Sequence, residues 1–271
     1  MVDLLDRARA AVGDRADLPG MSLLEHLQEL RKRLVYSLLS IGAGFCVAYG
    51  FHDRISALMI EPITKALSDN HLPTQLAYLN PMDPFNFYLK IGLFGGIILA
   101  SPFILYQVWL FIAPGLYQNE KRYVVPFMSA TVGLFLAGAY FGYRFVYPGA
   151  LTFLIGYGAQ FKPVVTISEY MELFSTVILG LGIVFELPIL IFFLALFGIV
   201  SSKWLIKNIR YAILVIFIVA GIITPTPDPL SMCIFATPML LLYVISIGVA
   251  HMVHPDRRNR IKKEKKEKQG A

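Results

Sequence analysis

Residues 101–126 read SPFILYQVWLFIAPGLYQNEKRYVVP, in which a short charged turn joins two apolar runs. Pro114 follows the end of the first run at Ile112 and prevents its helix from continuing. The turn, residues 118–122, contains one carboxylate, Glu120. Because a long apolar segment lies on either side, this pattern predicts two membrane-crossing helices that present Glu120 at a membrane surface.

The composition of the whole chain favours a membrane protein over a soluble one. Hydrophobic residues make up 56% of the 271 residues and charged residues 15%, with a mean hydropathy of +0.63. A soluble domain is about 45–50% apolar and about 25% charged. The apolar residues also fall into six runs, which predict an all-α, polytopic membrane protein with six transmembrane helices. The runs cover approximately residues 34–51, 89–112, 123–147, 170–200, 211–223 and 230–250.

The last two predicted spans are short. As a helix, residues 211–223 would reach only about 20 Å, against about 30 Å of hydrocarbon core. Pro238 is expected to interrupt the sixth run, and Pro188 to kink the long fourth run. We therefore expect a bundle that is shallow on one side. Two outer loops are predicted, a long one at 52–88 with short amphipathic pieces and a second at 148–168.

The predicted membrane domain, residues 22–253, lies between two polar tails. The N-terminal tail, residues 1–21, has no continuous apolar core and is therefore not a secretory signal peptide. After it, leucines at helical spacing predict an amphipathic helix that lies on the membrane surface and leads into the first span. These leucines are Leu23, Leu27, Leu30 and Leu34. The C-terminal tail, residues 254–271, is strongly basic.

Lysine and arginine are distributed unevenly between the two sides of this domain. Of the 24 Lys and Arg residues, 19 fall in the tails, in the segment leading into the first span, or in the loops after the second and fourth spans. The positive-inside rule therefore places both termini in the cytoplasm. We interpret the basic tail as an anchor on the anionic lipid bilayer, because no aromatic or motif-like feature supports nucleic-acid binding.

Glu186, in the sequence FELP, is the only ionisable residue deep inside a predicted span. Because a charge at the bilayer centre costs about 3 kcal/mol, this residue should face the bundle interior or a wet cavity. One interpretation is a structural hydrogen bond to a neighbouring helix, and another is a polar patch for a membrane-embedded partner. A third makes Glu186 the proton or ion site of a secondary transporter.

Glu29 and Glu120 are both expected at the cytoplasmic mouth of the bundle. Each has a simple structural role, because Glu29 can pair with Arg33 and Glu120 suits the start of the third span. Together they would also bind a ligand with adjacent guanidinium groups. The sequence contains no P-loop, HExxH, GxSxG or zinc-ligand pattern, so we predict neither an enzyme nor a bound metal or cofactor. The two cysteines, Cys46 and Cys233, are interpreted as buried hydrophobic residues.

Several segments resemble the TatC family, the multispanning receptor subunits of the twin-arginine protein translocase. They are His26–Leu34 (HLQELRKRL), Ser101–Trp109 (SPFILYQVW), Phe111–Tyr117 (FIAPGLY), Glu120–Arg122 (EKR), Phe185–Pro188 (FELP) and the turn Thr224–Asp228 (TPTPD). The segments occur in the same order over nearly the whole chain, Leu23–Val249. The resemblance implies that the six helices form a concave, glove-like bundle.

The resemblance also implies a function in Sec-independent protein translocation. TatC proteins recognise twin-arginine signal peptides on folded export substrates, recruit TatA-like and TatB-like single-span partners, and depend on the proton-motive force. Location in the cytoplasmic membrane and self-association in a larger complex are implied as well. By their motif positions, the signal-peptide-binding residues would be Glu29, Arg31, Phe111, Leu116 and Glu120. Glu186 would form an intramembrane polar site, and structural or partner contacts would involve Pro62, Pro102 and Asp228.

One position departs from the family pattern. After the TPTPD turn, TatC proteins often carry glutamine near the outer start of the last span, where this chain has Met232. A polar contact with a single-span partner at this position is therefore not supported by this sequence. The N-terminal extension of about 20 residues is a further local difference.

Overall fold

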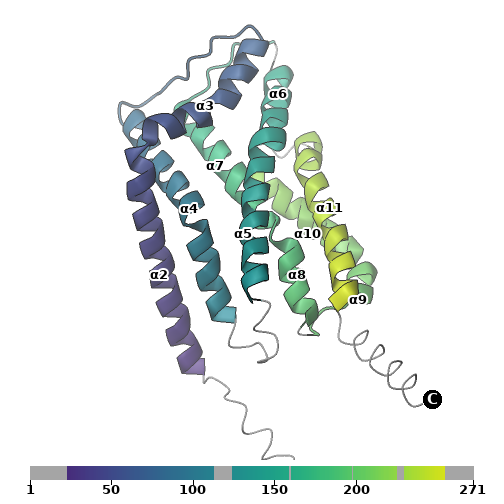
Figure 1. The fold of residues 1–271 in the computed structure, drawn as a ribbon. Helices are drawn as coiled ribbons and strands as arrows, with labels where there is room; N and C mark the ends of the chain where they lie inside the picture. Colours follow the sequence, from purple (N-terminus) through teal and green to yellow (C-terminus); the bar gives the residue numbers. More distant parts are fainter. Residues whose placement is uncertain (1–22, 113–123, 159, 197, 225–228, 254–271) are drawn as a thin grey trace, which may run out of the picture.

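The computed structural model describes residues 23–112, 124–158, 160–196, 198–224 and 229–253. Within these ranges the fold is all-helical, as predicted, apart from one isolated bridge between Ala77 and Thr166. Most of the helices run side by side, and α3 lies at one end of the bundle (Figure 1). The elements are α2 (Leu23–Gly50), α3 (His52–Asp69), α4 (Asp83–Ile112), α5 (Val124–Phe141), the π-helix η3 (Gly142–Val146), α6 (Tyr147–Tyr157), α7 (Ile167–Val184), α8 (Leu187–Leu196), α9 (Ser202–Lys207), α10 (Ile209–Ile223) and α11 (Pro229–Val253).

Helices α2 and α4 pack closely because glycines leave room for their backbones. A Cβ atom on Gly44 would lie 2.6 Å from the carbonyl oxygen of Gly96, and a Cβ on Gly96 would lie 2.7 Å from the backbone nitrogen of Phe45. Small residues at a helix crossing permit this approach. The crossing therefore determines which residues meet at the ends of the two helices.

The predicted amphipathic helix and the first span form one continuous helix of 28 residues, α2. The sequence contains no glycine or proline between residues 23 and 41, so nothing in it bends or stops the helix there. Leu27 and Leu34 of the leucine stripe face outward, since they are 59% and 57% exposed.

The predicted loop at 52–88 contains α3, a helix of 18 residues that is longer than the short pieces expected there. Its buried residues are Met59, Pro62, Ile63, Ala66 and Leu67. Two tyrosines from later in the chain also bind its backbone. The hydroxyl of Tyr143 donates to the carbonyl oxygen of Leu58 at 2.9 Å, and the hydroxyl of Tyr170 donates to that of Met59. This segment is thus an integral part of the bundle.

The helix that begins at Val124 continues to Tyr157, so the predicted loop at 148–168 is wrong over its first ten residues. The π-helical segment η3 joins α5 to α6 with helical backbone angles at both junctions. A proline in an α-helix clashes with the carbonyl group four residues earlier. For Pro148 this residue is Arg144, which lies in the wider π turn, and the wider turn relieves the crowding. Pro148 therefore lies in the first turn of α6 instead of ending the helix.

Two other prolines have opposite effects on their helices. As predicted, the chain breaks near Pro188, because α7 ends at Val184 and α8 begins at Leu187. By contrast, α11 continues through Pro238, so the predicted interruption of the last apolar run is wrong. A proline removes one backbone hydrogen bond, and packing against neighbouring helices, here α8 and α10, keeps such a helix continuous.

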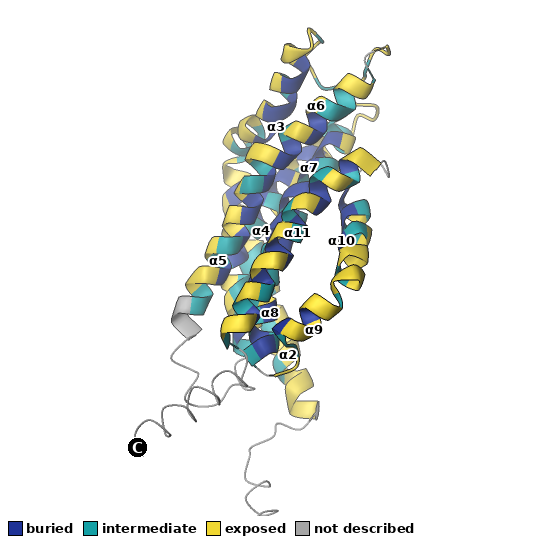
Figure 2. Ribbon diagram, turned by 90° about the vertical axis from the view of Figure 1, so that its right-hand side faces the viewer, coloured by how far each residue is buried: buried dark blue, intermediate teal, exposed yellow. Residues whose placement is uncertain are grey.

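Several helices are long and apolar enough to cross a membrane. These segments are Leu24–Gly50, Asp83–Phe111, Ile167–Leu196 and Pro229–Val253. They identify the chain as a membrane protein. The apolar helix α10 has only 15 residues, or about 22 Å, and most of its surface is exposed or half-buried (Figure 2).

Both cysteines are exposed, so the prediction that Cys46 and Cys233 are buried is wrong. They lie in apolar helices but face away from the neighbouring helices. In a membrane protein an apolar run indicates contact with lipid as well as contact with protein, because lipid tails are as apolar as the core. Burial within the protein therefore cannot be inferred from the apolar run alone.

Candidate functional site

The N-terminal end of α2 and the C-terminal end of α4 bring together polar and aromatic side chains that are far apart in the sequence. Nε of Arg33 donates to Oε1 of Glu29 at 2.7 Å, and Nη1 of Arg33 donates to Oε1 of Gln107 at 3.0 Å. Beside them, the rings of His26 and Phe111 stack with their centroids 4.4 Å apart. We call these five residues the α2–α4 site.

The α2–α4 site holds a carboxylate against a guanidinium while leaving both partly open. The side chains of Glu29 and Arg33 are 21% and 19% exposed. Their spacing of four residues places them on the same side of α2, and Gln107 extends the contact to α4. An ion pair of this kind is stronger than a neutral hydrogen bond but still exchanges with other charged groups, because water reaches it.

The structure places two of the predicted signal-peptide-binding residues, Glu29 and Phe111, in this one site. Arg31 lies elsewhere, since two residues along an α-helix lead to roughly the opposite side. It borders a shallow surface depression with Gln28, Lys32, Val35 and Tyr36. Leu116, Glu120 and Asp228 lie outside the described residues.

The predicted structural prolines are both inside helices. Pro62 lies in α3 and is buried, at the end of the bundle opposite the α2–α4 site (Figure 1). Pro102 lies in α4, five residues before Gln107, directly after the buried Ser101. Neither proline belongs to the α2–α4 site.

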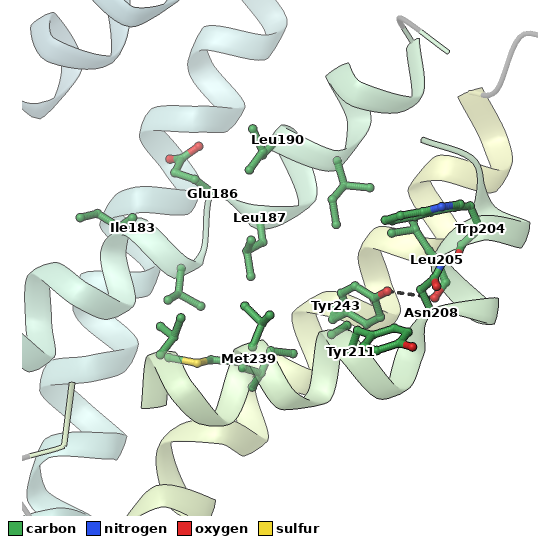
Figure 3. Close-up of a pocket in the computed structure, with 16 residues that line it drawn as sticks. Ile183, Glu186, Leu187, Leu190, Trp204, Leu205, Asn208, Tyr211, Met239 and Tyr243 are labelled. Carbon is green, nitrogen blue, oxygen red and sulfur yellow. Dashed lines mark hydrogen bonds between the residues drawn. The ribbon is translucent and has the colours of Figure 1, made fainter. Parts of the chain in front are cut away.

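Glu186 lies in the break between α7 and α8, and its Oε1 is buried with no hydrogen-bond partner among the described residues. The predicted structural hydrogen bond to a neighbouring helix is therefore not found for this atom. The residue borders one end of an apolar groove of about 610 Å³, and Trp204 and Asn208 border the other end (Figure 3). We call this the α8–α10 groove.

The walls of the α8–α10 groove come from α7, α8, α9, α10 and α11. The short helix α9, which the apolar pattern does not predict, begins where the hydroxyl of Ser201 accepts a hydrogen bond from the backbone of Trp204 at 3.2 Å. Inside the groove, the hydroxyl of Tyr243 donates to the carbonyl oxygen of Leu205 at 3.0 Å, which fixes α9 on α11.

Sequence reasoning missed two members of the α2–α4 site, Gln107 and the ring of His26. The signal for Gln107 was present, because it is the one amide in the apolar run from 101 to 112. His26 offers no comparable signal, since a histidine near a membrane interface is common without a binding role. Among the described residues, no group of three or more His, Cys, Asp or Glu side chains could hold a metal ion.

Comparison with known proteins now identifies the family. The family profile described as "Sec-independent protein translocase protein (TatC)" matches residues 25–238. A Koribacter versatilis protein named Sec-independent protein translocase protein TatC is 59% identical over 262 residues, which cover 97% of this chain and 96% of that protein. A protein of the same name from Carboxydothermus hydrogenoformans is 37% identical over 236 residues, covering 87% and 95%.

Solved structures agree with these sequence matches. A crystal structure of the twin arginine translocase receptor TatC matches with a TM-score of 0.74 and 35% identity, covering 83% of this chain and 98% of that chain. A second crystal structure of this receptor, in DDM, matches with a TM-score of 0.75 and 36% identity, covering 83% and 99%. The chain therefore belongs to the TatC family of Sec-independent protein translocase proteins.

Proposed function

We propose that this protein is the receptor that binds twin-arginine signal peptides of folded export substrates in the cytoplasmic membrane. The observation that carries this proposal is the α2–α4 site, in which Glu29 already holds a guanidinium group, that of Arg33. A carboxylate placed to bind one arginine side chain is chemically suited to bind another. No catalytic step is assigned to the protein.

The chemistry of the α2–α4 site matches a peptide that carries arginines next to an apolar segment. The carboxylate of Glu29 would accept hydrogen bonds from one peptide guanidinium. Glu120, in the segment that follows α4 in the sequence, would supply the second carboxylate. The stacked rings of His26 and Phe111 offer a flat surface on which a guanidinium or an apolar side chain can lie.

We further propose six membrane crossings with both termini in the cytoplasm. The crossings would be made by α2, α4, the continuous helix α5–η3–α6, the broken helix α7–α8, α10 and α11. An even number of crossings brings the basic tail to the same side as Arg31, Lys32 and Arg33, which agrees with the positive-inside rule. In this arrangement the α2–α4 site faces the cytoplasm, where export substrates are made.

Partner binding follows from the apolar surface that the bundle leaves open. The apolar part of a bound signal peptide would lie along the concave side, next to Glu186. TatA-like and TatB-like single-span proteins, or further copies of this chain, would cover other exposed faces, with transport driven by the proton-motive force. The exposed large hydrophobic residues of α2 and α10 support such contacts.

Binding of a fluorescent twin-arginine peptide to the purified full-length protein in detergent tests the receptor function. Glu29→Gln should weaken binding about tenfold or more, because a hydrogen bond to a charged group contributes about 1.5–3 kcal/mol. Glu120→Gln should act similarly, and a Lys-Lys peptide should bind weakly to all variants. Glu172→Gln, an exposed carboxylate on α7, is the matched control. Equal affinities for Arg-Arg and Lys-Lys peptides in the unchanged protein would refute the proposal.

A secondary transporter that uses Glu186 is the alternative function. One observation favours it: Glu186 lies where a membrane-length helix is broken, as ion sites of transporters often do. Proton flux into proteoliposomes separates the two functions. Under the receptor proposal, the unchanged protein and Glu186→Gln should give the same background flux. A flux that Glu186→Gln abolishes would favour the transporter.

A further inference from the structure

Three cations occur on α9 and at the start of α10, next in sequence to Trp204, Asn208 and Tyr211, which line one end of the α8–α10 groove. Lys203, Lys207 and Arg210 are all exposed there, and none of the three forms an ion pair within the described ranges. The guanidinium carbon of Arg210 lies 5.6 Å from the ring centroid of Tyr211, and Tyr211 lines the groove. The guanidinium group of Arg210 therefore lies beside a residue that lines the apolar groove.

The groove itself is open and apolar, so something must cover it in the membrane. Among the side chains that line it, Leu190, Val215 and Tyr211 are 53%, 56% and 59% exposed. The hydroxyl of Tyr243 is already bonded to the backbone of Leu205 and requires no ligand. An occupant of the groove must therefore be apolar along most of its length.

We propose that the α8–α10 groove binds one anionic phospholipid. The phosphate group would lie beside Lys203, Lys207 and Arg210, and one acyl chain would extend along the groove toward Leu187. This inference does not depend on the receptor function proposed above.

The dimensions and the ends of the groove fit this occupant. Its volume of about 610 Å³ lies within the roughly 300–1,000 Å³ typical of small-molecule sites. The α8 wall has ten residues and is about 15 Å long, which is sufficient for most of an acyl chain. Trp204 and Tyr211 stand at the charged end, as amphipathic aromatic residues do at the boundary between lipid tails and headgroups (Figure 3).

The charge distribution favours an anionic lipid over a neutral lipid or an apolar helix. A neutral lipid or a wholly apolar segment would fill the groove but leave the three cations without a counter-charge. An anionic phospholipid satisfies both parts of the site, because its acyl chain fills the apolar groove and its phosphate supplies the counter-charge for the three cations. Each lysine or arginine near a membrane surface strengthens binding of anionic lipid by roughly fivefold.

Native mass spectrometry of the full-length protein, with equal amounts of phosphatidylglycerol and phosphatidylcholine in the detergent, tests the proposal. The unchanged protein should retain phosphatidylglycerol preferentially. The triple variant Lys203→Gln/Lys207→Gln/Arg210→Gln should lose most of this preference. The variant Arg54→Gln/Lys65→Gln/Lys162→Gln removes the same charge away from the groove and should keep it. Equal retention of the two lipids by the unchanged protein, or equal losses in both triple variants, would overturn the proposal.

A second pair of variants tests whether the acyl chain occupies the groove. Val215 lines the groove and Leu214 does not, although both are similarly exposed at 56% and 58%. Val215→Trp should therefore reduce phosphatidylglycerol retention, whereas Leu214→Trp should not. Equal retention by these two variants would mean that lipid binds only to surface charge, contrary to the proposal. A lipid-free dimer that Val215→Trp disrupts would assign the groove to a second copy of the chain and would equally overturn it.

Discussion

Replacing Gly44 by alanine tests the crossing of α2 and α4, on which the α2–α4 site depends. The new Cβ would lie 2.6 Å from the carbonyl oxygen of Gly96, whereas ordinary contact begins at 3.4 Å. The two backbones would therefore have to separate by about 0.8 Å, since the atom in contact belongs to the backbone and cannot rotate away. Overpacking of this kind costs about 1–3 kcal/mol.

Gly42 provides a matched control on the same helix. A Cβ at Gly42 meets nothing within 4 Å, so Gly42→Ala should gain about 0.5–1 kcal/mol from the helix preference of alanine. The two variants should therefore differ by about 1.5–4 kcal/mol in free energy of unfolding. Titration with SDS in mixed micelles, followed by circular dichroism, measures this difference.

The same separation should also disturb binding at the α2–α4 site. Arg33 of α2 bonds to Gln107 of α4, and His26 of α2 stacks on Phe111 of α4. Gly44→Ala should thus weaken twin-arginine peptide binding, while Gly42→Ala should leave it unchanged. If the two variants unfold with free energies within 0.5 kcal/mol of each other, which is below the expected difference of about 1.5–4 kcal/mol, the close approach of the backbones is refuted.

Three further predictions concern single side chains. Gln107→Leu removes one acceptor of Arg33. Because a partly exposed hydrogen bond contributes about 1 kcal/mol, the affinity for a twin-arginine peptide should fall roughly fivefold in a fluorescence anisotropy assay. Unchanged affinity would mean that Glu29 alone positions Arg33. Glu186→Leu should maintain or raise the free energy of unfolding in SDS, since Oε1 of Glu186 is buried without a partner in the described part of the chain. A marked decrease in this free energy would reveal a structural hydrogen bond. Phe235→Ala should lower the free energy of unfolding by about 3–5 kcal/mol, because Phe235 is 0% exposed. Val244→Ala, at a position that is 60% exposed, should have a much smaller effect. Similar losses in the two variants would contradict the assignment of Phe235 to the core.

The positions of the helices follow largely from the sequence, and the exceptions have identifiable causes. The apolar runs at 89–112 and 211–223 lie within α4 and α10, because a long apolar run specifies a helix regardless of its neighbours. Prolines were the main source of error. Pro188 lies at a break, Pro148 is accommodated by a π turn, and Pro238 lies inside a continuous helix. Which outcome occurs depends on packing around each proline, which the local sequence does not contain.

The candidate site was only partly predictable for the same reason. The pair of Glu29 and Arg33 follows from their spacing of four residues on one helix. The contact of Arg33 with Gln107 joins residues 74 positions apart and depends on the glycine crossing of α2 and α4. Family resemblance pointed to Glu29 and Phe111 without any indication that a neighbouring histidine would stack on the ring.

The sequence by itself determined that this protein is a helical membrane protein, and approximately where its helices lie. Transfer of an apolar run into lipid depends on the composition of that run alone, so the local sequence determines which segments enter the membrane. The tertiary structure alone decided which faces of the helices meet, and with them the α2–α4 site and the α8–α10 groove. Lipid and protein are equally apolar surroundings for leucine, so hydrophobicity cannot distinguish an outward face from an inward one. Close packing at residues such as Gly44 and Gly96 makes that choice.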